Sequence, residues 1–328
     1  MKHIFTVHSP ITFFCAYEVI DHEAIDEKDV IFLCSNYKPP FDYGKIINSF
    51  AELKTSFLSK IIQFNLVKNY DSYIDHITGE QEFIAYVDLV HYYQKILISH
   101  KKCLAFNFIE EGTASYVKPR NLSDLTHIER KSNFRYRHIK GKLKSVIRVL
   151  RGFNLKILSI PYYANAFSFL ENIKFYTFSE SAYPGIPDEK RIILRASADN
   201  IHFQEYYPLY KALIFIEESF HKAYAISEQN YSEALKKTID IVRERFDNRE
   251  IHVKMRPGSD RQNSILLDQL DNNKINYTIF SDSTLIEPLL IKSKDCVLIG
   301  TVSSVLFYGA IFGHQSYSNF KLIKNKPV

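Results

Sequence analysis

Short apolar runs alternate with longer segments of helical periodicity along most of this 328-residue chain, and this alternation constrains the fold more than any other feature. An alternating order of this kind favours parallel sheets that are covered by helices. The apolar runs predict strands at residues 4–7, 30–34, 61–67, 103–109, 212–216, 251–255, 275–280 and 296–300. Helices are expected at residues 11–20, 83–100, 227–246, 285–291 and 305–312. We therefore expect an α/β protein.

The alternation is interrupted in the middle of the chain. The stretch from Arg130 to Arg151 contains nine Lys or Arg residues and no Asp or Glu. Residues 184–187, with two prolines and a glycine, indicate a loop and a linker region. Because the alternation resumes near Lys211, the sequence predicts two domains, residues 1–207 and 208–328.

Composition excludes several classes of protein. The net charge of +5 suits an anionic donor or an acidic membrane surface, but it is far below that of a nucleic-acid-binding protein. The first apolar stretch is too short for a signal peptide, and no window approaches the roughly 18 apolar residues of a membrane span. The protein is expected in the cytoplasm, either free or peripheral on the inner membrane. Four cysteines lack metal-ligand spacing and are expected to be buried free thiols in a reducing compartment: Cys15, Cys34, Cys103 and Cys296.

The first candidate site is the sequence Glu110-Glu111-Gly112-Thr113, which follows a predicted strand. In open α/β sheets, ligands bind at the carboxyl ends of strands. Adjacent carboxylates repel each other, which raises the pKa of one of them and suits a general base. Gly112 permits a sharp turn at this point. The alternative is a solvated acidic turn, since the motif is short.

Two further clusters follow predicted strands. One carries cations that can neutralise a phosphate leaving group, namely Lys254 and Arg256, followed by Pro257. The other leads into a helix and offers hydroxyl and backbone N–H donors to an anion: Gly300, Thr301, Ser303 and Ser304. Their alternatives are an exposed cationic turn and an ordinary helix cap. His8, beside the end of the first strand, is interpreted as part of a structural turn. The Asp-x-Asp signature of metal-dependent sugar transferases is missing from the sequence, so no metal site is predicted.

In their order along the chain, these clusters resemble the motifs of bacterial sialyltransferases of the lipooligosaccharide type (glycosyltransferase family 52-like) and of the related capsule polysialyltransferases. Glu110-Glu111-Gly112 is similar to the acidic-acidic-glycine motif of the N-terminal domain, and Ser303-Ser304 to the paired hydroxyl motif of the C-terminal domain. Ser9-Pro10 resembles the first strand–turn of these proteins, and Glu287 resembles the acidic residue that holds cytidine or ribose. Where the family has His before Pro, this chain has Arg256, which cannot donate a proton near neutral pH.

The resemblance implies a glycosyltransferase-B fold, with two Rossmann-like domains facing a cleft. Residues 1–207 would be the acceptor-side domain and residues 208–328 the domain that binds the nucleotide sugar. The implied reaction is an inverting transfer of a sialic-acid-like nonulosonic acid from a CMP donor to a lipooligosaccharide or capsule glycan, with no metal and no further cofactor. Glu111, or else Glu110, would take the proton from the acceptor hydroxyl. The CMP phosphate would be held by Arg256, Lys254, Ser303 and Ser304.

Two alternatives remain: a transferase for another nucleotide sugar, such as CMP-Kdo, and a non-catalytic glycan-binding protein of the same fold. The expected partners are a nucleotide sugar and a glycan or glycolipid acceptor, without nucleic acid, and a homodimer is the oligomer considered. The basic stretch from Arg130 to Arg151 is spaced so that part of it can lie on anionic lipid as an amphipathic helix. It can also bind an acidic acceptor, or be a solvated helix face.

Overall fold

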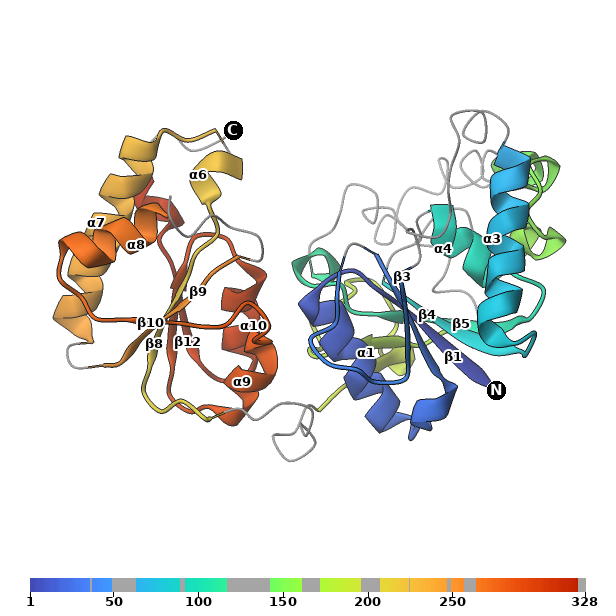
Figure 1. Ribbon diagram of the computed structural model, residues 1–328, viewed down its shortest axis with the longest axis horizontal. Helices are drawn as coiled ribbons and strands as arrows, with labels where there is room; N and C mark the ends of the chain where they lie inside the picture. The colour runs from blue at the N-terminus through green and yellow to red at the C-terminus, as the bar shows by residue number, and fades with distance from the viewer. Residues whose placement is uncertain are drawn as a thin grey trace. The chain divides into compact units, whose positions relative to one another are not determined.

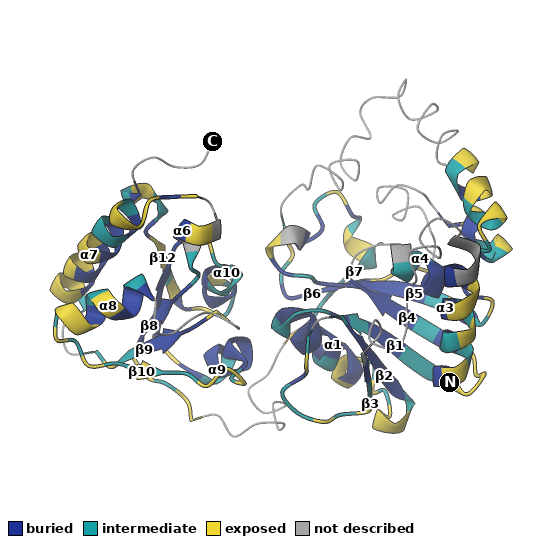
Figure 2. Ribbon diagram, turned by 45° about the horizontal axis from the view of Figure 1, so that its top comes forward, coloured by how far each residue is buried: buried dark blue, intermediate teal, exposed yellow. Residues whose placement is uncertain are grey.

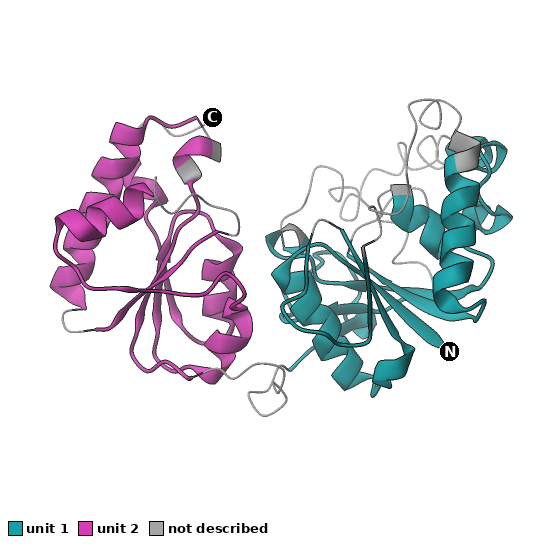
Figure 3. Cartoon of the chain, in the orientation of Figure 1, with its two compact units in different colours: residues 1–196 teal, residues 197–328 magenta. Residues whose placement is uncertain are grey.

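The computed structural model describes residues 1–35, 37–48, 63–88, 92–116, 142–160, 172–195, 207–223, 225–246, 249–256 and 264–323. The chain divides into two compact units, residues 1–196 and 197–328 (Figure 3). Each unit holds one parallel sheet covered by helices, so the predicted α/β class with two Rossmann-like domains is confirmed. The first unit ends at residue 196, whereas the sequence predicted that the first domain ends at residue 207.

The first unit contains a seven-stranded parallel sheet in the order β3-β2-β1-β4-β5-β6-β7. Its strands are β1 (Lys2–Val7), β2 (Val30–Cys34), β3 (Lys45–Asn48), β4 (Phe83–Val87), β5 (Cys103–Ile109), β6 (Phe175–Thr177) and β7 (Arg191–Ile193). Every residue of β2 is buried, as expected for a strand covered on both faces. The strand order reverses between β1 and β4, which makes this point the topological switch of the sheet.

Helices cover both faces of this sheet, with α1 (Pro10–His22) on one face and α3 (Gln63–Thr78) and α4 (Tyr92–Ser99) on the other (Figures 1 and 2). The core beneath α3 and α4 joins Ile74 and Leu97 to Ala85 of β4. Residues 142–150 form another helix. Short 3-10 turns are η1 (Glu27–Asp29), η2 (Thr113–Ser115), η4 (Leu155–Leu158) and η6 (Asp188–Lys190).

Three sequence predictions for the first unit are wrong. The strand predicted at residues 61–67 is, from Gln63 onward, the start of α3, because the apolar spacing continues helically through Tyr70 and Ile74. The single helix predicted at residues 83–100 is β4 followed by α4, since periodicity alone does not separate a short buried strand from a buried helix. The loop at residues 184–187 connects β6 to β7 inside the first unit and is not a linker between units.

The second unit contains a five-stranded parallel sheet in the order β10-β9-β8-β11-β12. Its strands are β8 (Leu213–Ile216), β9 (Ile251–Lys254), β10 (Thr278–Ile279), β11 (Val297–Gly300) and β12 (Gln315–Ser318). Its helices are α6 (Phe220–Ala223), α7 (Glu228–Arg245), α8 (Ile265–Asn272), α9 (Ile286–Lys292) and α10 (Ser304–Ile311), with a 3-10 turn η9 (Phe320–Leu322). The order reverses between β8 and β11, the second topological switch.

Two core clusters hold this unit together, one beneath α7 and α8 and the other beneath α9 and α10. Figure 1 shows these helix pairs on opposite faces of the sheet. The sequence predicted α7, α9 and α10 to within two residues at each end. All four cysteines are buried and free, as predicted. Among the described residues, no helix is long and apolar enough to cross a membrane.

Candidate active site

Polar side chains gather at the switch point of the first sheet. His8 follows β1, Asp88 follows β4 and Glu111 lies two residues beyond β5. Because these strands are parallel neighbours, their carboxyl ends share one edge of the sheet. This is the edge at which open α/β sheets bind their ligands.

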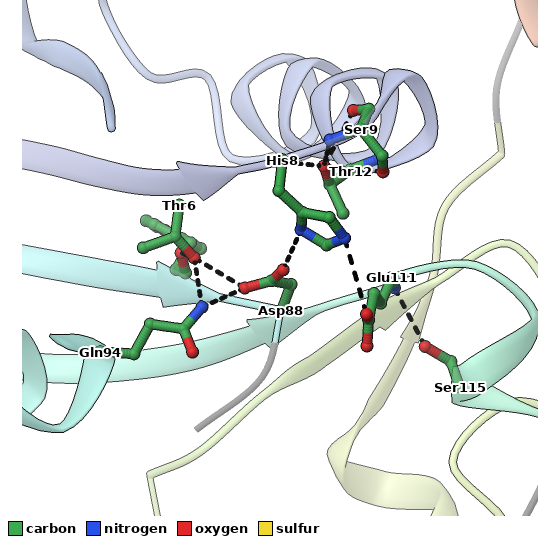
Figure 4. A network of polar contacts seen from close by, with 9 residues as sticks. Thr6, His8, Ser9, Thr12, Asp88, Gln94, Glu111 and Ser115 are labelled. Carbon is green, nitrogen blue, oxygen red and sulfur yellow. Dashed lines mark hydrogen bonds and ion pairs between the residues drawn. The ribbon is translucent and has the colours of Figure 1, made fainter. Parts of the chain in front are cut away.

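His8 lies between the two carboxylates (Figure 4). Its Nδ1 forms a short contact with Oδ2 of Asp88, and its Nε2 lies 3.5 Å from Oε1 of Glu111. Asp88 is itself held in place, because its Oδ1 accepts hydrogen bonds from Thr6 Oγ1 at 3.0 Å and from Gln94 Nε2. The sequence reading of His8 as a purely structural turn is therefore incomplete, since the turn delivers its ring to the site.

Burial and charge change the acidity of these groups. Burial raises the pKa of Glu111 to about 7; the negative charge of Asp88 acts in the same direction, and the charge of His8 opposes it. The hydrogen bond to Asp88 raises the pKa of His8, with the charges of Asp88 and Glu111 adding to it and burial opposing. A carboxyl group that titrates near neutral pH is suited to take up and release a proton.

The same three side chains form a group that can hold a metal ion. His8, Asp88 and Glu111 each offer one ligand atom, and within the described residues these atoms all lie within 4.8 Å of one another. Imidazole with two carboxylates suits a transition-metal ion. The geometry thus allows a proton-transfer group or a metal site, and the two differ in their response to chelators.

Glu110 and Glu111 occupy different environments. Glu110 is fully buried, and its Oε2 accepts hydrogen bonds from Thr177 Oγ1 at 2.5 Å and from the backbone N–H of Phe178 at 2.8 Å. These bonds join the end of β5 to β6. Glu111 keeps one carboxylate oxygen, Oε2, without a hydrogen-bond partner in the described residues. The geometry favours Glu110 as a structural group and Glu111 as the reactive one.

The turns around this site follow the predicted motif. Gly112 has φ +122°, a value that side-chain-bearing residues rarely adopt, and the exposed Thr113 begins the turn η2. Ser9 caps α1 in a reciprocal capping box with Thr12, and Pro10 is the first residue of that helix. The hydroxyl of Thr12 also accepts from the backbone N–H of His8 at 3.1 Å, which fixes the residue that carries the imidazole.

The switch point of the second sheet already holds a carboxylate from the chain itself. Oε2 of Glu218, just beyond β8, accepts from the backbone N–H groups of Thr301 at 2.6 Å and Val302 at 3.0 Å. A Cβ at Gly300 would lie 3.3 Å from this oxygen and 3.2 Å from Cβ of Ile216, so glycine allows the close approach. The amides of this turn, which the sequence analysis offered to an anion, thus donate to a carboxylate of the chain itself.

Among the described residues, two serine hydroxyls follow this turn, and the charge of Arg256 acts on Glu218. Ser303 caps α10 by accepting from the N–H of Val305 at 3.2 Å, and Ser304 is the first helical residue. Arg256, beyond β9, is exposed, and its charge lowers the pKa of Glu218 while burial, the larger effect, raises it. Pro257 lies outside the described residues.

Two other predicted residues are buried away from solvent. Lys254 donates through Nζ to the carbonyl of Thr284 at 2.9 Å and so supports the loop before α9. Glu287, in the first turn of α9, is 3% exposed, and its Oε2 has no hydrogen-bond partner in the described residues. Burial raises the pKa of Glu287, and the charge of nearby Lys254 opposes that shift. Lys254, the last residue of β9, and Glu287 are thus buried, whereas Arg256 lies at the surface.

The resembled family has a histidine where this chain has Arg256. The described histidines of the second unit, His221, His252 and His314, are engaged elsewhere. Burial lowers the pKa of His221, whose ring stacks on Tyr231. His252 stacks on Phe280, and His314 bonds to the carbonyl of Leu290. At position 256 itself the chain has an exposed arginine, whose charge acts on Glu218 beside the Thr301 turn.

Sequence reasoning missed Asp88 and Glu218. Asp88 was hidden inside the helix predicted for residues 83–100; a polar residue directly after the apolar run of β4 was the signal available. Glu218 lies two residues beyond β8, but nothing in the sequence indicates that its carboxylate reaches the turn after β11.

Comparison with known proteins gives one family. The family model described as alpha-2,8-polysialyltransferase matches residues 23–316. A search of curated protein sequences finds no match.

Solved structures of low similarity include two epimerases and one transferase. The UDP-GlcNAc 2-epimerase from Neisseria meningitidis bound to UDP-GlcNAc is 10% identical, covers 93% of this chain and 79% of that one, and has a TM-score of 0.46. The Methanocaldococcus jannaschii UDP-GlcNAc 2-epimerase is 11% identical, covering 98% and 91%, with a TM-score of 0.47. The E. coli ADP-heptose LPS heptosyltransferase II is 8% identical, covering 96% and 83%, with a TM-score of 0.39. Likenesses this low carry no argument about the chain.

Proposed function

The chain belongs to the alpha-2,8-polysialyltransferase family, and from this premise we propose that it transfers a sialic-acid-like nonulosonic acid from a CMP donor to a surface glycan with inversion. Family membership makes it a sialyltransferase-type glycosyltransferase. The donor, the stereochemistry and independence from metal ions are our proposal. Within the family, we propose that it shares the chemistry of the lipooligosaccharide sialyltransferases.

The observation that carries the proposal is the environment of Glu111. Its carboxyl group lies at a sheet switch point with a pKa raised to about 7 and one oxygen without a partner in the described residues. In the proposed reaction the Glu111 carboxylate accepts the proton of the acceptor hydroxyl. The hydroxyl oxygen then bonds to the anomeric carbon as the bond from that carbon to the phosphate oxygen breaks, and CMP leaves.

His8 and Asp88 are positioning residues in this scheme. Asp88, fixed by Thr6 and Gln94, orients the imidazole, and the positive charge of His8 stabilises the carboxylate form of Glu111. Without that cation the raised pKa would leave less of the base ionised near neutral pH.

The leaving phosphate is assigned to the second unit. The amides of Thr301 and Val302 are used by Glu218, so we assign charge neutralisation to Arg256 and hydrogen bonding to the hydroxyls of Ser303 and Ser304. A capping serine oxygen that accepts from an amide still has its O–H free to donate. Since arginine does not supply a proton, the phosphate leaves as an anion held by charge. We also propose that Oε2 of buried Glu287, which has no hydrogen-bond partner in the described residues, accepts a hydrogen bond from a ribose hydroxyl.

A nucleotide panel tests this function directly. Thermal stability is measured with CMP, CDP, UDP and GDP, followed by turnover of CMP-sialic acid and CMP-Kdo with a glycan acceptor. Stabilisation by CMP and transfer from CMP-sialic acid are expected. Transfer from CMP-Kdo alone would change the donor, and stabilisation by a diphosphate instead of CMP would remove the proposed donor class. CMP binding without turnover on sialylated or lipid-linked acceptors would favour the glycan-binding alternative.

A further inference from the structure

Exposed apolar side chains are concentrated in one segment of the first unit. Thirteen large hydrophobic residues are exposed in the described chain, and six of them lie between residues 143 and 158. These six are Leu143, Val146, Ile147, Leu150, Leu155 and Leu158. Single exposed apolar residues are ordinary, but a concentration of them marks an interaction surface.

Four of these residues share one face of the helix at residues 142–150. Their spacing of three, four and seven positions places Leu143, Val146, Ile147 and Leu150 in a row, which we call the apolar stripe. Leu150 is 77% exposed and Leu143 is 60% exposed. The helix packs on the unit through other residues, because Ser145 is buried and Val149 contacts the main core cluster. The stripe is therefore not a core face of this unit.

Cations border the apolar stripe. Residues 130–170 contain ten Lys or Arg residues and no Asp or Glu. In the described part, Lys142 and Arg151 are exposed at the two ends of the helix. Lys95 on α4 lies close enough to the helix that burial, together with the charges of Arg148 and Lys144, lowers its pKa to about 8. The described segment at residues 142–158 therefore combines exposed aliphatic groups with five Lys or Arg residues and no Asp or Glu.

We propose that the helix at residues 142–150 binds an anionic lipid bilayer, with the apolar stripe at the boundary of headgroups and acyl chains. Lys142 and Arg151 then lie at the level of the lipid phosphates. Aliphatic residues on one face, flanking Lys and Arg and an absence of acids are the features of interfacial amphipathic helices. An acidic glycan would engage the cations but would leave four aliphatic side chains in water. A protein interface is less consistent, because Lys is depleted in such interfaces.

Co-sedimentation of the full chain with vesicles tests this surface independently of transferase activity. The vesicles contain phosphatidylcholine alone or phosphatidylcholine mixed with phosphatidylglycerol. The chain is expected to bind the mixed vesicles and to be released by salt. The double variant Leu143→Ser/Leu150→Ser should lower the partition coefficient by at least about tenfold, since both leucines leave the bilayer boundary. Ile241→Ser, at a 41% exposed position on α7, is the matched control and should bind like the unmodified chain.

A second variant tests the charge. Lys142→Gln/Arg151→Gln should lower binding to mixed vesicles roughly fivefold per cation and weaken the dependence on salt. It deletes no apolar contact, so it keeps the test decisive if the double serine variant does not fold. The proposal would be overturned if the unmodified chain bound neutral vesicles equally well, or if both double variants bound like the unmodified chain. It would also be overturned if Leu143→Ser/Leu150→Ser abolished self-association of the chain and left vesicle binding intact. The last result would assign the stripe to a contact between copies of the chain.

Discussion

Nε2 of His8 lies 3.5 Å from Oε1 of Glu111, although one residue follows β1 and the other follows β5. The parallel sheet brings them together at its switch point, where Asp88 from β4 holds the far side of the imidazole. Burial raises the pKa of Glu111 to about 7, and the charge of His8 lowers it. A change in either group should therefore shift the pKa of Glu111 near neutral pH. The first three predictions concern this relationship.

Glu111→Gln should lower kcat by about 10²- to 10⁴-fold, because the acceptor hydroxyl loses its proton acceptor. Glu110→Gln is the matched control: it disturbs the bonds to Thr177 and Phe178 and should cost stability, with less than about tenfold loss in kcat of the folded enzyme. Donor-saturated turnover measures both. Losses below about tenfold in both variants would show that neither glutamate is the base.

The rate constant kcat/KM should rise with pH through about 7, as Glu111 loses its proton. His8→Gln removes the positive charge that lowers the pKa of Glu111, so the acidic limb should move upward by roughly one pH unit. His22→Gln, at the exposed end of α1, is the control. A lower rate without movement of the limb would mean that His8 has only a structural role.

Glu111→Gln should also stabilise the fold in a pH-dependent way. Because the folded pKa of Glu111 lies above the unfolded value, its contribution to stability is complete below about pH 4.5 and is lost as pH rises through about 7. After discounting for partial exposure, the variant should gain roughly 1–2 kcal/mol at pH 8 and almost nothing at pH 4. Urea unfolding at the two pH values measures this, and an equal gain at both would contradict the raised pKa.

Arg256→Met should weaken CMP binding by about 10- to 100-fold, because a charge-assisted contact to the phosphate is lost. Arg256 is exposed, so the fold should be unaffected. Arg245→Met, exposed in the last turn of α7, is the control of equal charge. Isothermal titration with CMP distinguishes them; equal affinities in the two variants would remove Arg256 from the donor site.

Chelation distinguishes proton transfer from metal binding as the role of the His8, Asp88 and Glu111 group. If these residues move a proton, turnover should be unchanged after dialysis against EDTA. If they hold a metal, activity should disappear and return with a divalent transition metal. The second outcome would replace the proposed metal-independent mechanism.

Much of the second unit could be predicted from sequence because its signals are local. Ser227 caps α7 and Ser303 caps α10 at the positions that the sequence indicates. The first unit was harder, since no glycine or proline stands between the strand Phe83–Val87 and α4, and the two merge into one apolar pattern. That error concealed Asp88, the residue that gives His8 its orientation.

The sequence by itself determined the alternating α/β class, the positions of the strand-end motifs and the presence of two adjacent glutamates. Only the tertiary structure gave those glutamates different environments, because the burial of Glu110 against Thr177 and the approach of His8 to Glu111 join strands far apart in the chain. The tertiary structure also brings the Glu218 carboxylate to the backbone amide of Thr301, which the sequence analysis had offered to an anion. Periodicity and caps depend on neighbours within a few residues, whereas the pKa and partners of a side chain depend on what the sheet order brings beside it.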